Sequence, residues 1–94
     1  MTIERKQEYI DKMVDNLPML RIKMKMTQKE LADILGLSSY TILAMEKKQR
    51  KMTWNTFLSI LFVCLEFEEI RPILKILEIY TDELVDFIEG KYKK

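Results

Sequence analysis

Histidine is absent from the 94-residue sequence, and cysteine, glycine and proline are scarce. The single cysteine rules out an intramolecular disulfide, and no Gly-rich phosphate-binding loop is present. Without histidine or a second cysteine, the residues also offer no cluster of soft metal ligands. We therefore expect a protein that is not an enzyme and that needs no metal or cofactor.

Strand-like alternation of polar and apolar residues is also rare, and only two glycines and two prolines interrupt the chain. This pattern favours an all-α fold. Hydrophobic residues make up 48% of the sequence, enough to build one core in a single domain, residues 1–94.

Long apolar runs are missing as well. The longest, FLSILFVCL, has nine residues with a serine in it, too few to cross a bilayer, and the first twelve residues are charged throughout, unlike a signal peptide. Cys64, the single cysteine, lies within this apolar run and is typical of a small buried hydrophobic residue in a reducing compartment. We expect a soluble, cytoplasmic protein that does not enter a membrane.

Charge is distributed unevenly, although the net charge is only +1. Residues 1–53 contain 11 basic and 7 acidic residues, a balance of +4, whereas residues 54–94 contain 5 and 8, a balance of −3. A basic half with an acidic back is typical of a small DNA-binding domain, and ordinary charge scatter on a soluble surface explains it about as well.

Residues 27–47, TQKELADILGLSSYTILAMEK, predict two short helices joined by a tight turn. Thr27 and Glu30 form a capping box that starts the first helix. Gly36 suits the left-handed position that ends it, and Ser38 caps the second helix. The apolar residues expected to face inward are Leu31, Ile34, Leu35, Ile42 and Met45.

This stretch resembles the helix-turn-helix of the Xre-type regulators, the family of phage lambda repressor and Cro. The matching residues are Thr27, Gln28, Leu31, Ala32, Gly36, Ser38, Ile42, Met45 and Glu46. The wider resemblance covers about residues 17–65 and includes Arg21, which such proteins pair with the glutamate at the Glu46 position, a basic loop, and a following apolar helix. In the family this loop usually carries a glycine near Lys48 and a proline near Met52, and both are absent here.

The resemblance implies a lambda-repressor-like helix-turn-helix core over residues 17–65. To it the sequence adds an N-terminal helix within residues 1–16 and two C-terminal helices within residues 66–94. Asn16 and Pro18 predict a break between this first helix, residues 2–15, and a second one at residues 18–25. Further helices are expected after Thr53, at residues 72–80, and from Thr81 to Gly90.

Applied to these residues, the family's mode of binding places the second helix of the motif in the major groove of double-stranded DNA. Base contacts are expected from Ser39, Tyr40 and Ala44. Phosphate contacts are expected from Gln28, Lys29, Ser38, Thr41, Lys47, Lys48, Arg50 and Lys51.

Two of these assignments, and the role of Arg21, have plain alternatives. Lys29 is equally well explained as a solvated surface lysine, and the cations of residues 47–51 could form a solvated loop. Arg21 could contact phosphate, but the structural ion pair with Glu46 is the favoured interpretation.

The resulting hypothesis is a sequence-specific transcriptional regulator, a repressor that binds DNA as a homodimer, because operators generally supply two half-sites. The expected dimer interface consists of Ile76, Tyr80, Leu84, Phe87 and Ile88. The alternative is an antitoxin-like or other protein-binding module that docks a protein partner on its C-terminal apolar helices.

Overall fold

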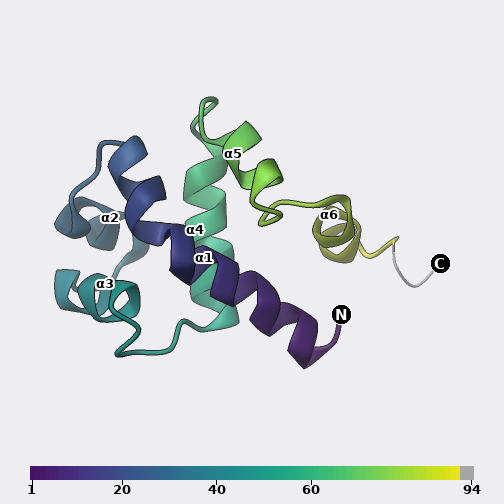
Figure 1. The fold of residues 1–94 in the computed structure, drawn as a ribbon, viewed down its shortest axis with the longest axis horizontal. Helices are drawn as coiled ribbons and strands as arrows, with labels where there is room; N and C mark the ends of the chain where they lie inside the picture. Colours follow the sequence, from purple (N-terminus) through teal and green to yellow (C-terminus); the bar gives the residue numbers. More distant parts are fainter. Residues whose placement is uncertain (92–94) are drawn as a thin grey trace.

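The computed structural model describes residues 1–91, and in this part of the chain it contains six helices and no strand (Figure 1). In order these are α1 (Ile3–Lys23), α2 (Gln28–Leu35), α3 (Ser39–Glu46), α4 (Trp54–Leu65), α5 (Arg71–Ile76) and α6 (Asp82–Glu89). The predicted all-α fold is confirmed. Helix α1 crosses α4 at the centre, with α2 and α3 on one side of the crossing and α5 and α6 on the other (Figure 1).

Helix α1 is continuous, so the predicted break at Asn16 and Pro18 is wrong. Proline within a helix costs about 3 kcal/mol, because it removes one hydrogen bond and clashes with the preceding turn. Met13, Leu17 and Leu20 are fully buried on one stripe that runs past Pro18. Burying each such side chain contributes about 1.5–3 kcal/mol, so tertiary packing outweighs the local signal.

Three aromatic rings fill the crossing of α1 and α4. Trp54 and Phe57 stack with ring centroids 4.9 Å apart, and Tyr9 packs against them at 6.4 and 6.0 Å. Cys64 is buried in the same core, where desolvation raises the pKa of its thiol to about 12. The thiol is therefore protonated and inert at neutral pH.

The start of α1 is held by the C-terminal helices of the same chain. Arg5 donates to both carboxylate oxygens of Glu83, with its Nη2 2.8 Å from Oε1, and the Tyr9 hydroxyl hydrogen-bonds to Thr81, the residue that caps α6. The Lys6 ammonium lies 5.5 Å from the centre of the Phe87 ring. The two segments outside the resemblance to a known family thus pack against each other.

Most helices end in a left-handed residue, and three of these are not glycine. Gly36 and Gly90 end α2 and α6 as predicted, whereas Lys25, Lys48 and Glu78, with φ of 59°, 60° and 59°, follow α1, α3 and α5. At Glu78 this conformation stops α5 four residues before its predicted end at residue 80. None of the helices described is long and apolar enough to cross a membrane.

Candidate nucleic-acid interface

The start of α2 is fixed by the predicted capping box. The Thr27 hydroxyl accepts a hydrogen bond from the Glu30 amide at 3.0 Å, and Glu30 Oε1 accepts one from the Thr27 amide at 2.8 Å. These bonds, the backbone one foremost, hold the pKa of the Glu30 carboxyl below its ordinary value. The capping box fixes the conformation of the first turn of α2. Thr27, Lys29 and Glu30 at this end of the helix are exposed to solvent.

The turn between α2 and α3 is set by local geometry. Gly36 adopts φ of 72°, which lets the Leu37 amide donate back to the Ala32 carbonyl at 2.9 Å. The Ser38 hydroxyl then accepts from the Thr41 amide at 3.1 Å, and the Ser38 and Thr41 hydroxyls lie 2.9 Å apart. One hydroxyl of that pair keeps its proton for a further acceptor.

A hydrogen-bonded network joins the ends of α1 and α3 to the first residue of α2. Arg21 Nε lies 2.8 Å from Glu46 Oε2, and Arg21 Nη1 donates to the Met26 carbonyl at 2.9 Å. Gln28 Nε2 donates to Glu46 Oε1 at 2.9 Å. The guanidinium is therefore occupied by protein groups, which supports the ion-pair interpretation of Arg21 over a phosphate contact.

Gln28 consequently has a structural partner that the sequence did not suggest. Its side-chain amide carries two hydrogens, and Glu46 accepts one of them. The second hydrogen remains available to a phosphate at the N-terminal end of α2. Lys29, the next residue, is exposed and makes no ion pair in the described part of the chain, which fits both of its interpretations.

The first turn of α3 presents polar groups to solvent. Ser39 is exposed and Tyr40 is 69% exposed, so both side chains are accessible. Ala44 is only 4% exposed, and the predicted base contact at this residue is wrong in this conformation. The chain turns after α3, where the Gln49 amide donates to the Ala44 carbonyl at 2.8 Å.

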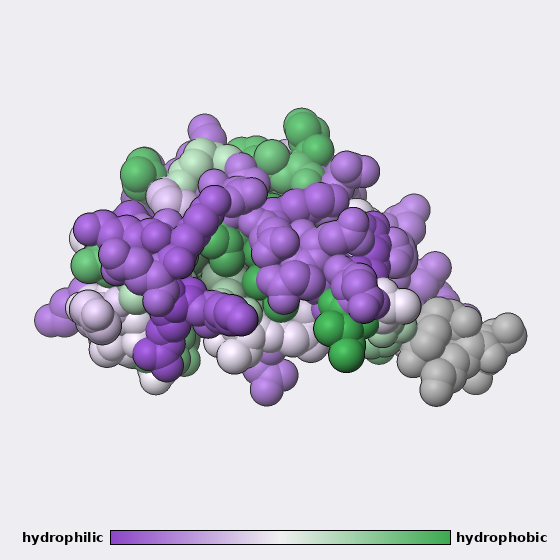
Figure 2. All heavy atoms as spheres, turned by 60° about the horizontal axis from the view of Figure 1, so that its bottom comes forward, coloured by the Kyte–Doolittle hydropathy of each residue, from purple (hydrophilic) through white to green (hydrophobic). Residues whose placement is uncertain are grey.

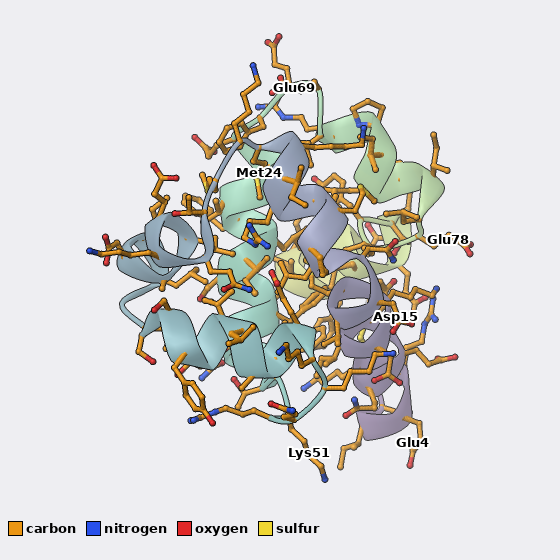
Figure 3. The ribbon with its side chains drawn as sticks, turned by 60° about the vertical axis from the view of Figure 1, so that its left-hand side comes forward. Glu4, Asp15, Met24, Lys51, Glu69 and Glu78 are labelled. Carbon is orange, nitrogen blue, oxygen red and sulfur yellow. The ribbon has the colours of Figure 1, made fainter. Side chains whose placement is uncertain are left out.

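The basic loop, residues 47–52, connects α3 to α4 with all of its cations exposed. These cations are Lys47, Lys48, Arg50 and Lys51. Met52 is 5% exposed and anchors the end of the loop in the core. Lys51 projects from the loop beside α3, at the opposite end of the molecule from Glu69 (Figure 3).

Lys48 alone among these cations forms an ion pair within residues 1–91. Its Nζ lies 2.7 Å from Oδ1 of Asp15 on α1. The hydrogen bond to Asp15 and the charges of Asp15 and Asp11 raise the pKa of Lys48, so it stays protonated over the physiological range. A groove of about 570 Å³ lies between α1 and the loop. Figure 2 shows this face as mostly hydrophilic, with a hollow between α1 and the loop.

The predicted dimer surface on α5 and α6 is interrupted. Ile76 and Ile88 are 80% and 59% exposed, Tyr80 and Phe87 are half-buried, and Leu84 is fully buried in the core. Leu84 is therefore wrongly assigned to an interface, because it is the residue by which α6 packs on its own chain. What remains exposed is two isoleucines rather than a continuous apolar face.

Two surface features were not found from the sequence. The first is the acidic side of α1, where Asp11 and Asp15 line the groove opposite the basic loop; their four-residue spacing was a usable signal. The second is an apolar groove of about 430 Å³ between α2 and α4. It includes Ile34, which the helical spacing had assigned to the interior, and Phe62, and these residues are 56% and 68% exposed.

Residues 1–91 contain no group of three or more His, Cys, Asp or Glu side chains arranged to hold a metal ion. No family model, curated protein or solved structure matches this chain. Its function is therefore inferred from the geometry of α2, α3 and the basic loop.

Proposed function

We propose that the protein is a sequence-specific, double-stranded DNA-binding transcriptional regulator. In this proposal α2, residues 36–38 and α3 form a helix-turn-helix. The observation that carries it is that the polar first turn of α3 is exposed and that a loop of exposed cations continues from the C-terminal end of the same helix. The Arg21–Glu46 pair holds that arrangement rigidly against α1.

The chemistry of the surface matches what a duplex offers. The major groove admits one α-helix, and a helix-turn-helix directs the N-terminal residues of its second helix at the base edges. Ser39 can donate to or accept from several bases, and Tyr40 can hydrogen-bond through its hydroxyl or press its ring on a thymine methyl. Lys47, Arg50 and Lys51, unpaired in the described chain, are available to phosphates.

Sequence preference would depend partly on DNA shape. Neither Ser39 nor Tyr40 makes the bidentate base contacts typical of Arg, Asn and Gln. The burial of Ala44 reduces direct readout further. We infer that phosphate placement and the deformability of the site carry much of the discrimination.

A single unit of this size covers one half-site, so the proposal includes a homodimer on DNA. Two such units on neighbouring half-sites would exclude other proteins from the same stretch of duplex, which favours repression by occupancy of the site. Light scattering with and without a duplex of two half-sites measures the assembly; one protomer per duplex at saturation would count against the dimer.

Binding to a short random-sequence duplex across a salt series tests DNA binding. The fourfold variant Lys47→Ala, Lys48→Ala, Arg50→Ala, Lys51→Ala should bind more weakly. The slope of log affinity against log salt should become shallower by about 0.9 for each phosphate that the variant no longer neutralises.

A matched pair of double variants controls for net charge. Arg50→Ala with Lys51→Ala should weaken binding, and Lys75→Ala with Lys91→Ala, which removes two exposed cations outside the proposed DNA-facing elements, should not. A folded wild-type protein that binds no duplex at low salt would refute the proposal.

The second candidate is a protein-binding module, and the observation that favours it is the apolar groove between α2 and α4. Ile34 and Phe62, both exposed, line this one groove, whereas the exposed Ile76 and Ile88 belong to two different C-terminal helices. A protein of this class would lose its partner on Phe62→Ser while keeping its affinity for a duplex, which separates the two functions.

A further inference from the structure

An acidic stripe of α1 faces the basic loop across the groove. Gln7, Asp11 and Asp15 recur at four-residue intervals, so they lie on one side of the helix. Gln7 Nε2 donates to Asp11 Oδ1 at 2.8 Å, which orients that carboxylate along the stripe. Opposite them, Lys48, Arg50 and Lys51 line the same groove.

The contact between the two sides is a single ion pair whose geometry is set by the backbone. Lys48 is held in the left-handed conformation by the bonds from its own amide to the Met45 carbonyl, 3.1 Å, and from the Gln49 amide to the Ala44 carbonyl, 2.8 Å. Asp15 is on the rigid α1. The backbone therefore places Lys48 and Asp15 close enough for their side chains to form the ion pair.

The pair is also easily exchanged. The side chains of Lys48 and Asp15 are 67% and 58% exposed, so water and ions reach both. An exposed ion pair contributes little to stability, because solvent screens it. A phosphate that approaches Lys48 competes with the Asp15 carboxylate for the ammonium, and it meets the charge of Asp11 one turn away.

We propose that Asp15, supported by Asp11, limits sequence-independent DNA binding by occupying Lys48 in the free protein. This inference rests on the proposed function. Sequence-independent binding is almost wholly electrostatic, so one cation withheld from phosphate lowers it directly. Arg50 and Lys51 form no ion pair in the described chain and can meet phosphate first, whereas the attraction of Lys48 for phosphate is partly offset by the neighbouring carboxylates.

The test measures the affinity of the full chain for a short random-sequence duplex, over a salt series, in a double-mutant cycle. The variants are Asp15→Asn, Lys48→Ala and the two combined. Asp15→Asn should tighten binding about two- to fivefold at low salt, and the salt slope should steepen by up to about 0.9. In the Lys48→Ala background the same change should have no effect.

Glu69→Gln is the matched control, because it removes one exposed carboxylate at the far end of the molecule (Figure 3). An equal gain in Glu69→Gln, or a gain that persists without Lys48, would show an effect of net charge and overturn the inference. Wild type that binds with a steep salt slope, together with an unchanged Asp15→Asn, overturns the inference but leaves the proposed function standing.

If neither wild type nor Asp15→Asn binds any duplex while thermal melts show both folded, the proposed function fails together with the inference. If only Asp15→Asn binds, the carboxylate is shown to be the barrier to binding. The results therefore distinguish a failure of the inference about Asp15 from a failure of the proposed DNA-binding function.

Discussion

Arg21 and Glu46, separated by 25 residues in sequence, meet with Arg21 Nε 2.8 Å from Glu46 Oε2. Their side chains are 14% and 7% exposed, so the pair is largely desolvated. Gln28 and the Met26 carbonyl complete its hydrogen bonds. This carboxylate therefore links α3 to the end of α1 and the start of α2, in addition to the core packing of Ile42 and Met45.

Glu46→Gln is expected to lower the free energy of unfolding by about 3 kcal/mol, because it strands the Arg21 charge away from water while nearly preserving shape. Urea unfolding followed by circular dichroism measures the loss. Glu66→Gln, a change of the same chemistry at an exposed residue, should cost less than about 0.5 kcal/mol. Equal losses in the two variants would mean that the pair does not hold α3.

Leu84→Ala is expected to destabilise the folded monomer by about 3 kcal/mol, since it opens a cavity in the core. Ile88→Ala, on the same helix and 59% exposed, should change stability by less than about 0.5 kcal/mol. Thermal melts at several protein concentrations measure both. A concentration-dependent loss in Ile88→Ala would instead indicate that α6 takes part in a dimer interface.

Glu78→Gly is expected to raise stability by up to about 1 kcal/mol, because glycine adopts the left-handed conformation without the steric cost that a side chain incurs. The ion pair with Lys12, at 4.0 Å and with an exposed Glu78, contributes little that would be lost. Lys75→Gly, inside α5, should lower stability by about 1 kcal/mol. The two glycines should therefore act in opposite directions in the same denaturation assay.

Stability should fall in acid partly through Glu30. Its pKa is lowered in the folded chain from an ordinary value of 4.5, so its contribution is fully present above that value and is lost as pH falls through the folded pKa. Glu30→Gln keeps an acceptor for the Thr27 amide but cannot titrate. The free energy of unfolding of the Glu30→Gln variant should thus vary less with pH below about 4.5 than that of wild type. Denaturant unfolding at a series of pH values measures both proteins. The same dependence of unfolding free energy on pH in wild type and variant would contradict this role of Glu30.

Local signals predicted the N-terminal ends of four helices well. The side chains of Thr27, Ser38, Thr53 and Thr81 all cap helices as expected, because an N-cap is a bond within four residues of sequence. The same locality explains the failure at Pro18, where the decisive term is packing of α1 on distant elements.

The features missed from the sequence share a cause, which is that they depend on tertiary position. Lys25, Lys48 and Glu78 end helices without being glycine, so composition gives no warning of them. Nothing in α6 distinguishes buried Leu84 from exposed Ile88 until the side that faces α1 is known. The Arg21–Glu46 pair was predicted only because the resemblance to a known family supplied its long-range partner.

The continuous helix α1 connects the C-terminal helix α6 to the proposed helix-turn-helix. Its 21 residues form a helix about 30 Å long. Near its N-terminal end Arg5 forms an ion pair with Glu83 of α6, and near its C-terminal end Arg21 forms an ion pair with Glu46 of α3. Two helices separated at Pro18 would be joined by a flexible connection, whereas the continuous helix fixes the distance between the contact with α6 and the contact with α3. The positions of α6 and α3 are therefore coupled through the backbone hydrogen bonds of a single element.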